Sequence, residues 1–359
     1  MDKTRIKPIL ATVPDSAMPG VTFRSTGGST GEPFRFPVAP EEANHAALDI
    51  WLGRRRLGIT PADPMFLLWG HAHLLGSGFR GAINKMRRQV SDRLLGYTRV
   101  SAYDLADEDL QLAGDRLIAD KPFYAVGYSS ALDRFARVNA DRARDFATLN
   151  LKAVIATAEG FPRADSRAVI GATFGAPVAM EYGAVETGPL AYEDPATGNG
   201  FAVFHIHHRL TLRGGDGPAA GEVLVTSLTP RALPLMRYAL GDLAVPGAIT
   251  PDGGITQIAR VIGRCNDVVT LPTGANIHSE AFTHCMRDMS GIAAYQVVAP
   301  QGDWPRLRYA APHELPKDAT QTVRRRLAVV DPALAEIALE RVDSLPLSVA
   351  GKHRMVVSD

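Results

Sequence analysis

A glycine-rich loop near the start of the chain constrains its fold and chemistry more than any other stretch. Three glycines stand among the six residues 26–31, after an apolar approach at Val21 and Phe23. Glycine lets the backbone adopt positive φ and come close to a ligand, and the hydroxyl and N–H groups of this loop are donors for an anion. The loop therefore predicts a phosphate cradle. Its residues are Thr26, Gly27, Gly28, Ser29, Thr30 and Gly31.

Taken alone, this loop is equally compatible with a solvated Gly/Ser linker. It is not a Walker loop, because no Lys follows the glycines and the G-x-x-x-x-G-K-[ST] spacing is absent. Motifs further along the chain favour the phosphate cradle.

Four later stretches carry short motifs, in the order EYGAVETG, RYALGD, GRCND and a final GK. They lie at Glu181–Gly188, Arg237–Asp242, Gly263–Asp267 and, after Leu345-Pro346, at Gly351-Lys352. With the glycine loop they resemble, in the right order, the T-S-G-[ST]-T-G-x-P, Y-G-x-x-E-x-G, R-Y-x-x-G-D, G-R-x-x-D and G-K signatures of the adenylate-forming superfamily. The resemblance covers nearly the whole chain.

Within that superfamily the chain looks most like the phenylacetate-CoA ligase branch and its capsule-biosynthesis relatives. The stretches that carry this likeness are Lys121-Pro122, Gly127–Ser130, Ala158-Glu159-Gly160 and Gly274–Ile277. About two dozen residues precede the glycine loop, fewer than is usual in the family. A partner such as a second copy of the chain, in a homodimer, is expected to cover what the missing helices would cover.

Composition narrows the class of partner and the compartment. The chain has 359 residues, of which 46% are hydrophobic, so it can fill the cores of one large and one small domain. Its net charge is +1, with 39 basic and 38 acidic residues, which argues against a nucleic-acid partner. Only two cysteines, Cys265 and Cys285, are present, and no leader or membrane-spanning run is evident. We expect a soluble cytoplasmic protein.

Hydrophobic periodicity predicts an α/β fold with a mostly parallel sheet, because short apolar runs alternate with helical patterns. Residues 203–245 instead suggest an antiparallel β subdomain, and the chain after about residue 265 suggests a small α+β unit. The predicted domains are a 1–264 adenylation core and a 265–359 mobile lid, with Asn266 at the hinge. Expected helices are 41–58, 104–119, 131–147, 279–289 and 320–329, and expected strands are 65–69, 123–126, 151–156, 178–180, 268–271, 295–298 and 337–342.

The resemblance implies a role for each matching residue. Glu186 is expected to bind Mg²⁺, Tyr182 to stack on adenine with Gly183 in the same nucleotide site, and Asp242 to accept the ribose hydroxyls, with Arg264 near the same ribose and phosphate. Lys352 is expected to reach the substrate carboxylate and α-phosphate when the lid closes. Taken singly, Glu186, Asp242 and Arg264 read as surface charges, Tyr182 as core and Lys352 as tail charge.

Other residues have weaker assignments. His71 and His73 follow a buried strand where the family lines its acyl pocket, and Glu159 is assigned to the same pocket. His205 and His207 are expected on one strand face, where a metal is an open but minor alternative because no cysteine ligands accompany them. The runs Arg54–Arg56 and Arg324–Arg326 are expected on solvated helix faces.

Two functions follow. The resemblance implies ATP-dependent activation of a small aryl or acyl carboxylic acid to an acyl-adenylate, with release of pyrophosphate and transfer to CoA. An amine, a hydroxyl or a carrier protein is the alternative acceptor. The second hypothesis is a catalytically inactive nucleotide-binding homologue that acts through protein partners. The presence of Glu186, Asp242 and Lys352 favours the enzyme.

Overall fold

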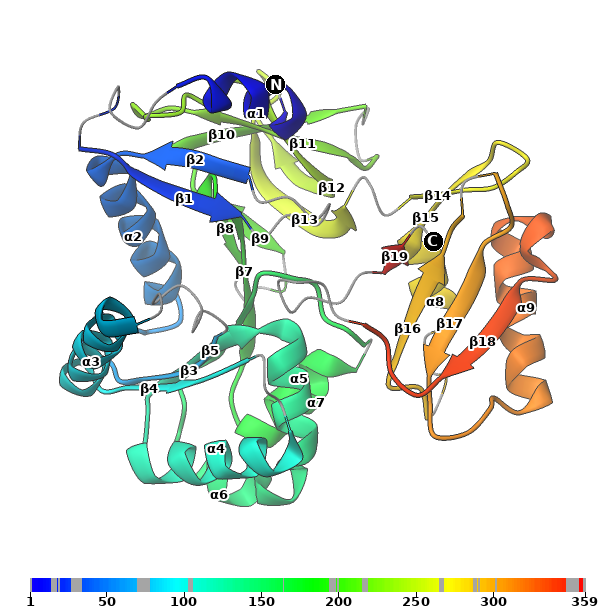
Figure 1. Ribbon diagram of the computed structural model, residues 1–359, viewed down its shortest axis with the longest axis horizontal. Helices are drawn as coiled ribbons and strands as arrows, with labels where there is room; N and C mark the ends of the chain where they lie inside the picture. Colours follow the sequence, from blue (N-terminus) through cyan, green and yellow to red (C-terminus); the bar gives the residue numbers. More distant parts are fainter. Residues whose placement is uncertain are drawn as a thin grey trace. The chain divides into compact units, whose positions relative to one another are not determined.

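The structure is a computed structural model (Figure 1). It describes residues 2–13, 18, 20–26, 34–69, 78–102, 106–163, 165–193, 198, 200–214, 219–264, 268–286, 289, 291–300, 302–346 and 355–357. The chain divides into two compact units. The first comprises Met1–Leu240 and Ala244–Val261, and the second comprises Gly241–Leu243 and Ile262–Asp359. The division at residues 261 and 262 lies close to the boundary expected from sequence.

An eleven-stranded sheet has the order β10-β11-β12-β13-β9-β8-β7-β6-β5-β3-β4. The strands from β4 to β7 pair in parallel, whereas β7 pairs with β8, and β8 with β9, in antiparallel fashion. The direction of the sheet therefore changes at β7. The strands are β3 (Met65–Leu68), β4 (Tyr97–Val100), β5 (Tyr124–Tyr128), β6 (Val154–Thr157), β7 (Val178–Ala184), β8 (Gly188–Glu193), β9 (Phe201–Val203), β10 (His208–Arg213), β11 (Gly221–Ser227), β12 (Tyr238–Ile249) and β13 (Ile255–Arg264).

Strands β3, β5 and β6 are buried on both faces, which explains their mainly apolar sequences. On β3, Phe66 and Leu68 join one core, while Met65 and Leu67 join another. The first core is completed by α4 (Asp107–Asp120), α5 (Ser129–Val138), α6 (Ala143–Ala147) and α7 (Ser166–Phe174), and the second receives residues of α2 (Pro40–Arg55). The remaining helix of this half is α3 (Gly78–Leu95).

A third core lies under the antiparallel half of the sheet. It is covered by the hairpin of β1 (Thr22–Thr26) and β2 (Phe34–Val38) and by α1 (Lys3–Ala11). Ile6 of α1 is 2% exposed and belongs to the same core as Phe36 and Tyr238. The N-terminal helix is thus part of the packed structure.

The second unit has its own core. Its four-stranded sheet has the order β18-β17-β16-β19 and packs with α8 (Ser279–Met286) and α9 (Lys317–Val330) around buried residues such as Phe282 and Leu327. A small hairpin of β14 (Val268–Thr270) and β15 (Asn276–His278) precedes α8. The sheet strands are β16 (Ala294–Val298), β17 (Arg306–Ala310), β18 (Ala338–Val342) and β19 (Val356–Val357).

The predicted fold class is confirmed, and several elements differ in detail. The expected helix 131–147 is interrupted at residues 139–142, where the Asn139 side-chain amide donates to two main-chain carbonyls and a 3₁₀ turn (Ala140–Arg142) follows. Helices α3 and α7 and the β1–β2 hairpin were not predicted. The prediction that Arg54 lies on a solvated face is wrong, because its guanidinium donates to the Tyr124 hydroxyl at 3.2 Å.

No helix in the described ranges is long and apolar enough to cross a bilayer.

A close contact between α2 and β8 gives the first prediction. A Cβ on Gly53 would lie 2.2 Å from Cδ2 of the fully buried Tyr192, so Gly53→Ala must displace an aromatic ring in the core. Such overpacking should lower the free energy of unfolding by about 1–3 kcal/mol in urea titrations. Gly171→Ala in α7 is the matched control, because its Cβ would meet neighbours at an ordinary 3.5 Å. Equal effects of the two changes would contradict this view of the contact.

Candidate functional site

The EYGAVETG motif forms the tight connection between β7 and β8. Residues 185–187 make the turn, and the strand register shifts between Tyr182 and Gly183. A Cβ on Gly183 would lie 2.5 Å from the carbonyl oxygen of Gly188, so only glycine fits there, and Gly188 itself has a φ of +76°. The two glycines of the motif therefore allow a close hairpin that fixes the intervening Glu186.

The Glu186 carboxylate is buried, with the residue only 2% exposed. Its Oε1 accepts a hydrogen bond from the Tyr238 hydroxyl at 3.0 Å and forms an ion pair with the Lys3 ammonium at 2.8 Å. No hydrogen bond or ion pair to Oε2 is found among the described residues. Two donors thus hold one oxygen of the carboxylate.

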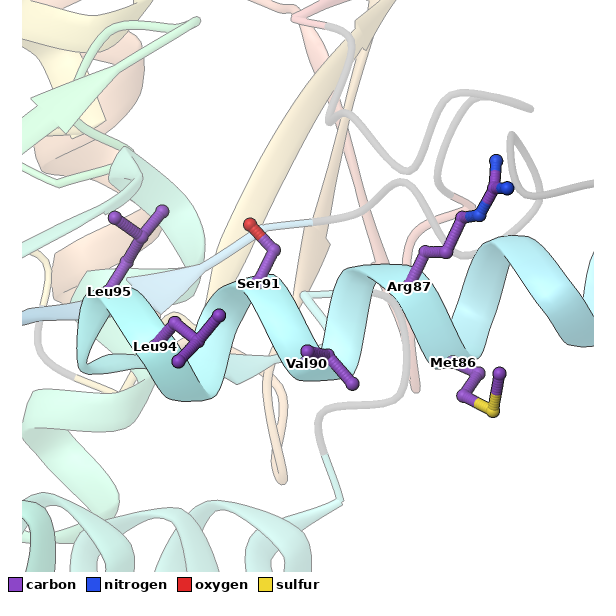
Figure 2. Close-up of a pocket in the computed structure, with 6 residues that line it drawn as sticks. All are labelled: Met86, Arg87, Val90, Ser91, Leu94 and Leu95. Carbon is purple, nitrogen blue, oxygen red and sulfur yellow. The ribbon is translucent and has the colours of Figure 1, made fainter.

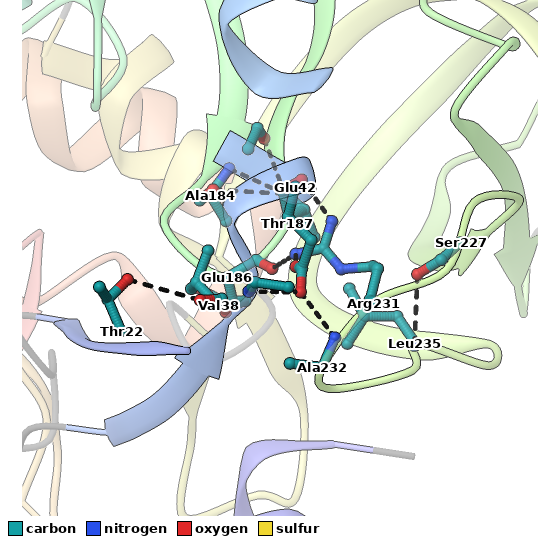
Figure 3. A network of polar contacts seen from close by, with 12 residues as sticks. Thr22, Val38, Glu42, Ala184, Glu186, Thr187, Ser227, Arg231, Ala232 and Leu235 are labelled. Carbon is teal, nitrogen blue, oxygen red and sulfur yellow. Dashed lines mark hydrogen bonds and ion pairs between the residues drawn. The ribbon is translucent and has the colours of Figure 1, made fainter. Parts of the chain in front are cut away.

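The main chain of the same turn is held by Arg231 (Figure 3). Its Nη2 donates to the carbonyl oxygen of Glu186 at 2.6 Å, and its Nη1 donates to that of Thr187 at 3.2 Å. The Arg231 side chain is 10% exposed, and it forms an ion pair with Glu42 at 2.9 Å. Burial lowers the pKa of Arg231 from its usual value, although the carboxylates of Glu42 and Glu186 oppose this change.

Glu42 connects this arrangement to α2. Its Oε1 accepts from the main-chain N–H of Ala39, at the start of the helix, at 3.0 Å and from that of Ala232 at 2.6 Å. One carboxylate therefore joins the N-terminus of α2, the loop before β12 and, through Arg231, the Glu186 turn (Figure 3). None of these partners was identified from sequence, because their contacts join residues far apart in the chain.

Two histidines, His207 and His45, lie near the buried Asp49. His207 Nδ1 is 2.8 Å from Oδ1 of the buried Asp49, and the His207 ring stacks on His45 with centroids 4.7 Å apart. Burial raises the pKa of the Asp49 carboxyl group, and the interaction with His207 opposes that change. The prediction that His205 and His207 share a strand face is wrong: residues 205–207 form a turn, with His205 exposed and His207 buried.

The described part of the chain contains no group of three or more His, Cys, Asp or Glu side chains arranged to hold a metal ion. A magnesium ion bound chiefly by nucleotide phosphates and water needs only one or two protein carboxylates. Glu186, with Oε1 held by two donors, fits that requirement through Oε2. Residues that hold one carboxylate oxygen in this way are typical partners of metal ligands.

The remaining described candidates are found on the sheet. Tyr182 lies on β7, half-buried, with its ring centroid 6.2 Å from that of Phe201. Within the second unit, Arg264 Nε lies 3.0 Å from Oδ1 of the buried Asp242, and the preceding Gly241 has a φ of +76°. The RYALGD and GRCND motifs are thus joined by an ion pair.

Glu159 follows β6 at its carboxyl end. Its Oε1 accepts from the main-chain N–H of Ser130 at 3.1 Å and from the Ser130 hydroxyl, at the start of α5. Its carbonyl oxygen accepts from the Ser129 hydroxyl at 2.8 Å. The carboxyl ends of parallel strands are where ligands bind in open α/β sheets, so this position is suited to a substrate pocket.

Several predicted site residues lie outside the described residues. The glycine loop connects β1 to β2, since Thr26 at the end of β1 pairs with Phe34. The predicted site residues outside the described part of the chain are Gly27, Gly28, Ser29, Thr30, Gly31, His71, His73, Asn266 and Lys352.

A hollow of about 400 Å³ lies along one side of α3 and contains none of the predicted site residues (Figure 2). It is lined mainly by exposed apolar side chains. These are Met86, Val90, Leu94 and Leu95, with Arg87 and Ser91.

No protein-family model matches the sequence, and no curated protein matches it. Solved structures do match. 2-Hydroxyisobutyryl-CoA ligase in the postadenylation state, in complex with 2-HIB-AMP, is 19% identical over 100% of this chain and 79% of that chain, with a TM-score of 0.71. The chain shares its fold.

Two other solved structures have a similar fold. Amide bond synthetase McbA from Marinactinospora thermotolerans is 17% identical over 96% of this chain and 71% of that chain, with a TM-score of 0.64. Anthranilate CoA ligase AuaEII, in complex with anthranoyl-AMP, is 16% identical over 92% and 65%, with a TM-score of 0.62. At these identities the likeness establishes the fold, which agrees with the motif resemblance.

His208, next to His207 and Arg231, gives a prediction for acid stability. Burial, together with the nearby Arg231, His207 and His45, lowers the pKa of His208 from 6.5 to about 4, although a hydrogen bond with the Thr187 backbone opposes the shift. Between these two values the unfolded chain binds a proton that the folded protein does not, so stability falls as pH falls. We expect the free energy of unfolding to drop by about 2 kcal/mol between pH 7 and pH 5 through this group.

Urea unfolding of wild type, His208→Gln and His205→Gln at both pH values measures this effect. His208→Gln should lose less stability on acidification than wild type, whereas the exposed His205→Gln should lose as much as wild type. Identical pH dependence in all three proteins would refute the assignment.

Proposed function

We propose that this protein activates a small organic carboxylic acid with ATP and transfers the acyl group to an acceptor. The observation that carries the proposal is the Glu186 turn. In a chain with the fold of CoA ligases and an amide bond synthetase, the turn that matches Y-G-x-x-E-x-G presents a buried, fixed carboxylate. A single fixed carboxylate is what a cation on nucleotide phosphates requires from the protein.

In the first half-reaction, a carboxylate oxygen of the substrate forms a bond to the α-phosphorus of ATP. The bond from that phosphorus to the β-phosphate bridging oxygen breaks, and pyrophosphate leaves. In the second, a nucleophile attacks the acyl carbonyl carbon, and AMP leaves with the bonding electrons. Both steps place negative charge on phosphate oxygens, so the protein must hold and orient those anions.

Roles are proposed from the motif resemblance. Glu186 would hold Mg²⁺ through Oε2, and the bound ion would neutralise charge on the phosphates. Tyr182 would stack on adenine, Gly183 would belong to the same nucleotide site, and Asp242 with Arg264 would contact the ribose and phosphate. Lys352 would stabilise charge at the α-phosphate. The glycine loop (Thr26, Gly27, Gly28, Ser29, Thr30, Gly31) would bind the leaving phosphates, His71, His73 and Glu159 would line the acid pocket, and Asn266 would be the hinge between the domains 1–264 and 265–359.

The acceptor is proposed to be CoA, by resemblance to the phenylacetate-CoA ligase branch. Two of the structural neighbours are CoA ligases, and another is an amide bond synthetase, so an amine is the second choice. A cytoplasmic location is proposed because two cysteines fit a reducing compartment.

The decisive experiment is the acid-dependent exchange of labelled pyrophosphate into ATP over a panel of aryl and short-chain acids, with Mg²⁺. We expect one class of acid to support exchange. Glu186→Gln should lower the exchange rate about 100- to 1,000-fold, the usual effect of removing one charge-stabilising group from such a site. Exposed Glu108→Gln is the matched control and should retain the wild-type rate.

If no acid of the panel supports exchange although the protein still binds ATP, the inactive nucleotide-binding homologue is favoured. Wild-type exchange by Glu186→Gln would reject the role of Glu186 while leaving the activity in place.

A further inference from the structure

The N-terminal helix contributes a side chain to the Glu186 site. Helix α1 is anchored by Ile6, which is 2% exposed in the core that also contains Phe36 and Val38 of β2. Its start is fixed by Asp2, whose Oδ1 accepts from the Arg5 main-chain N–H at 3.0 Å. Lys3, in the first turn, is therefore carried by a packed and capped helix.

The Lys3 ammonium lies 2.8 Å from Glu186 Oε1. The lysine side chain is 35% exposed, but the glutamate side chain is only 1% exposed. Exposed ion pairs contribute little, whereas a buried carboxylate depends strongly on its partners, because removing one leaves an uncompensated charge. Since the carboxylate of this pair is buried, Lys3 matters more to Glu186 than a surface lysine would.

The geometry at Oε1 fixes the orientation of the Glu186 carboxylate. Lys3 and Tyr238 both reach the same oxygen, and a carboxylate oxygen has two lone pairs. With those lone pairs engaged, the carboxylate plane is fixed and Oε2 is the oxygen left for a cation. Arg231 fixes the main chain of the same residue, so the backbone and the carboxylate are held by different donors.

We propose that Lys3 is a positioning residue for the Glu186 carboxylate, and that α1 thereby forms part of the site for the divalent cation and phosphates of the nucleotide. This inference rests on the proposed function. Partners that orient a ligating carboxylate raise metal affinity by about 10- to 100-fold. The positive charge of Lys3 also compensates the negative charge of Glu186. The metal and the phosphates would therefore bind beside an ion pair that is neutral overall.

The opposite role is competition between Lys3 and the metal for Glu186. The two roles differ in sign. If Lys3 orients the carboxylate, its removal weakens the metal-dependent part of nucleotide binding. If it competes, its removal strengthens that part.

Calorimetric titration of the full chain with ATP, once with Mg²⁺ and once with EDTA, gives the ratio of the two affinities. That ratio isolates the contribution of the metal from direct attraction between Lys3 and the phosphates. Lys3→Met should lower the ratio about tenfold, and Lys3→Arg, which keeps a cationic donor, should recover most of it. Arg5→Met is the matched control, because Arg5 belongs to the same helix, is 81% exposed in its side chain and makes no contact with Glu186 among the described residues. Its ratio should equal that of wild type.

Tyr238→Phe provides an independent variant if Lys3→Met proves unstable. It removes the other donor to Oε1, so it should also lower the ratio. Titration of Mn²⁺ into the protein–ATP complex, followed by the electron paramagnetic resonance signal of free Mn²⁺, should rank the variants in the same order.

An unchanged or increased ratio in Lys3→Met would overturn the inference without affecting the proposed function, because ATP would still bind. Failure of wild type to bind ATP at all would overturn the proposed function and, with it, this inference.

Discussion

The site depends on one buried arginine. The carbonyl oxygens of Glu186 and Thr187 lie in the β7–β8 turn, outside the strand pairing of the sheet. Buried carbonyl groups need hydrogen-bond donors, so these two must find donors elsewhere. The guanidinium of Arg231 supplies both, since its planar fork presents several N–H groups in a fixed geometry. A lysine at this position could not serve two carbonyl oxygens and the Glu42 carboxylate with the same fixed geometry. Glu42 compensates the charge of Arg231 and connects it to α2.

The position of this turn in the sheet explains why it can hold a fixed carboxylate. Strand β7 pairs in parallel with β6 and in antiparallel fashion with β8, so the turn lies at the change of direction in the sheet. The parallel half supplies a rigid base, in which β3, β5 and β6 are buried on both faces. The antiparallel half, with α1 and the β1–β2 hairpin on its core, supplies the donors Tyr238 and Lys3.

Local sequence predicted the parts of this arrangement that depend on local geometry. Met65–Leu68 could be assigned as a buried strand because all four side chains are apolar, and the structure buries its two faces in two different cores. The contacts of Lys3, Glu42 and Arg231 could not be predicted, because each residue reads locally as a solvated charge. These residues hold the Glu186 turn only because segments distant in the sequence pack against them.

The same reason explains the errors. Arg54 stands in a run of three arginines that suggests a polar surface, yet α2 turns it toward Tyr124. His205 and His207 have strand spacing, but the chain turns between β9 and β10 and separates an exposed ring from a buried one. In both cases tertiary packing overrode a local pattern.

Glu186 is proposed to be held in place to receive the cation of a bound nucleotide. A crystal structure of the protein with ATP and Mn²⁺, with anomalous scattering recorded at the manganese edge, tests this directly. We expect a manganese peak bonded to Glu186 Oε2 at roughly 2.1 to 2.2 Å, with Lys3 and Tyr238 still on Oε1. Nucleotide bound with its manganese away from Glu186, or at another place on the protein, would contradict the account.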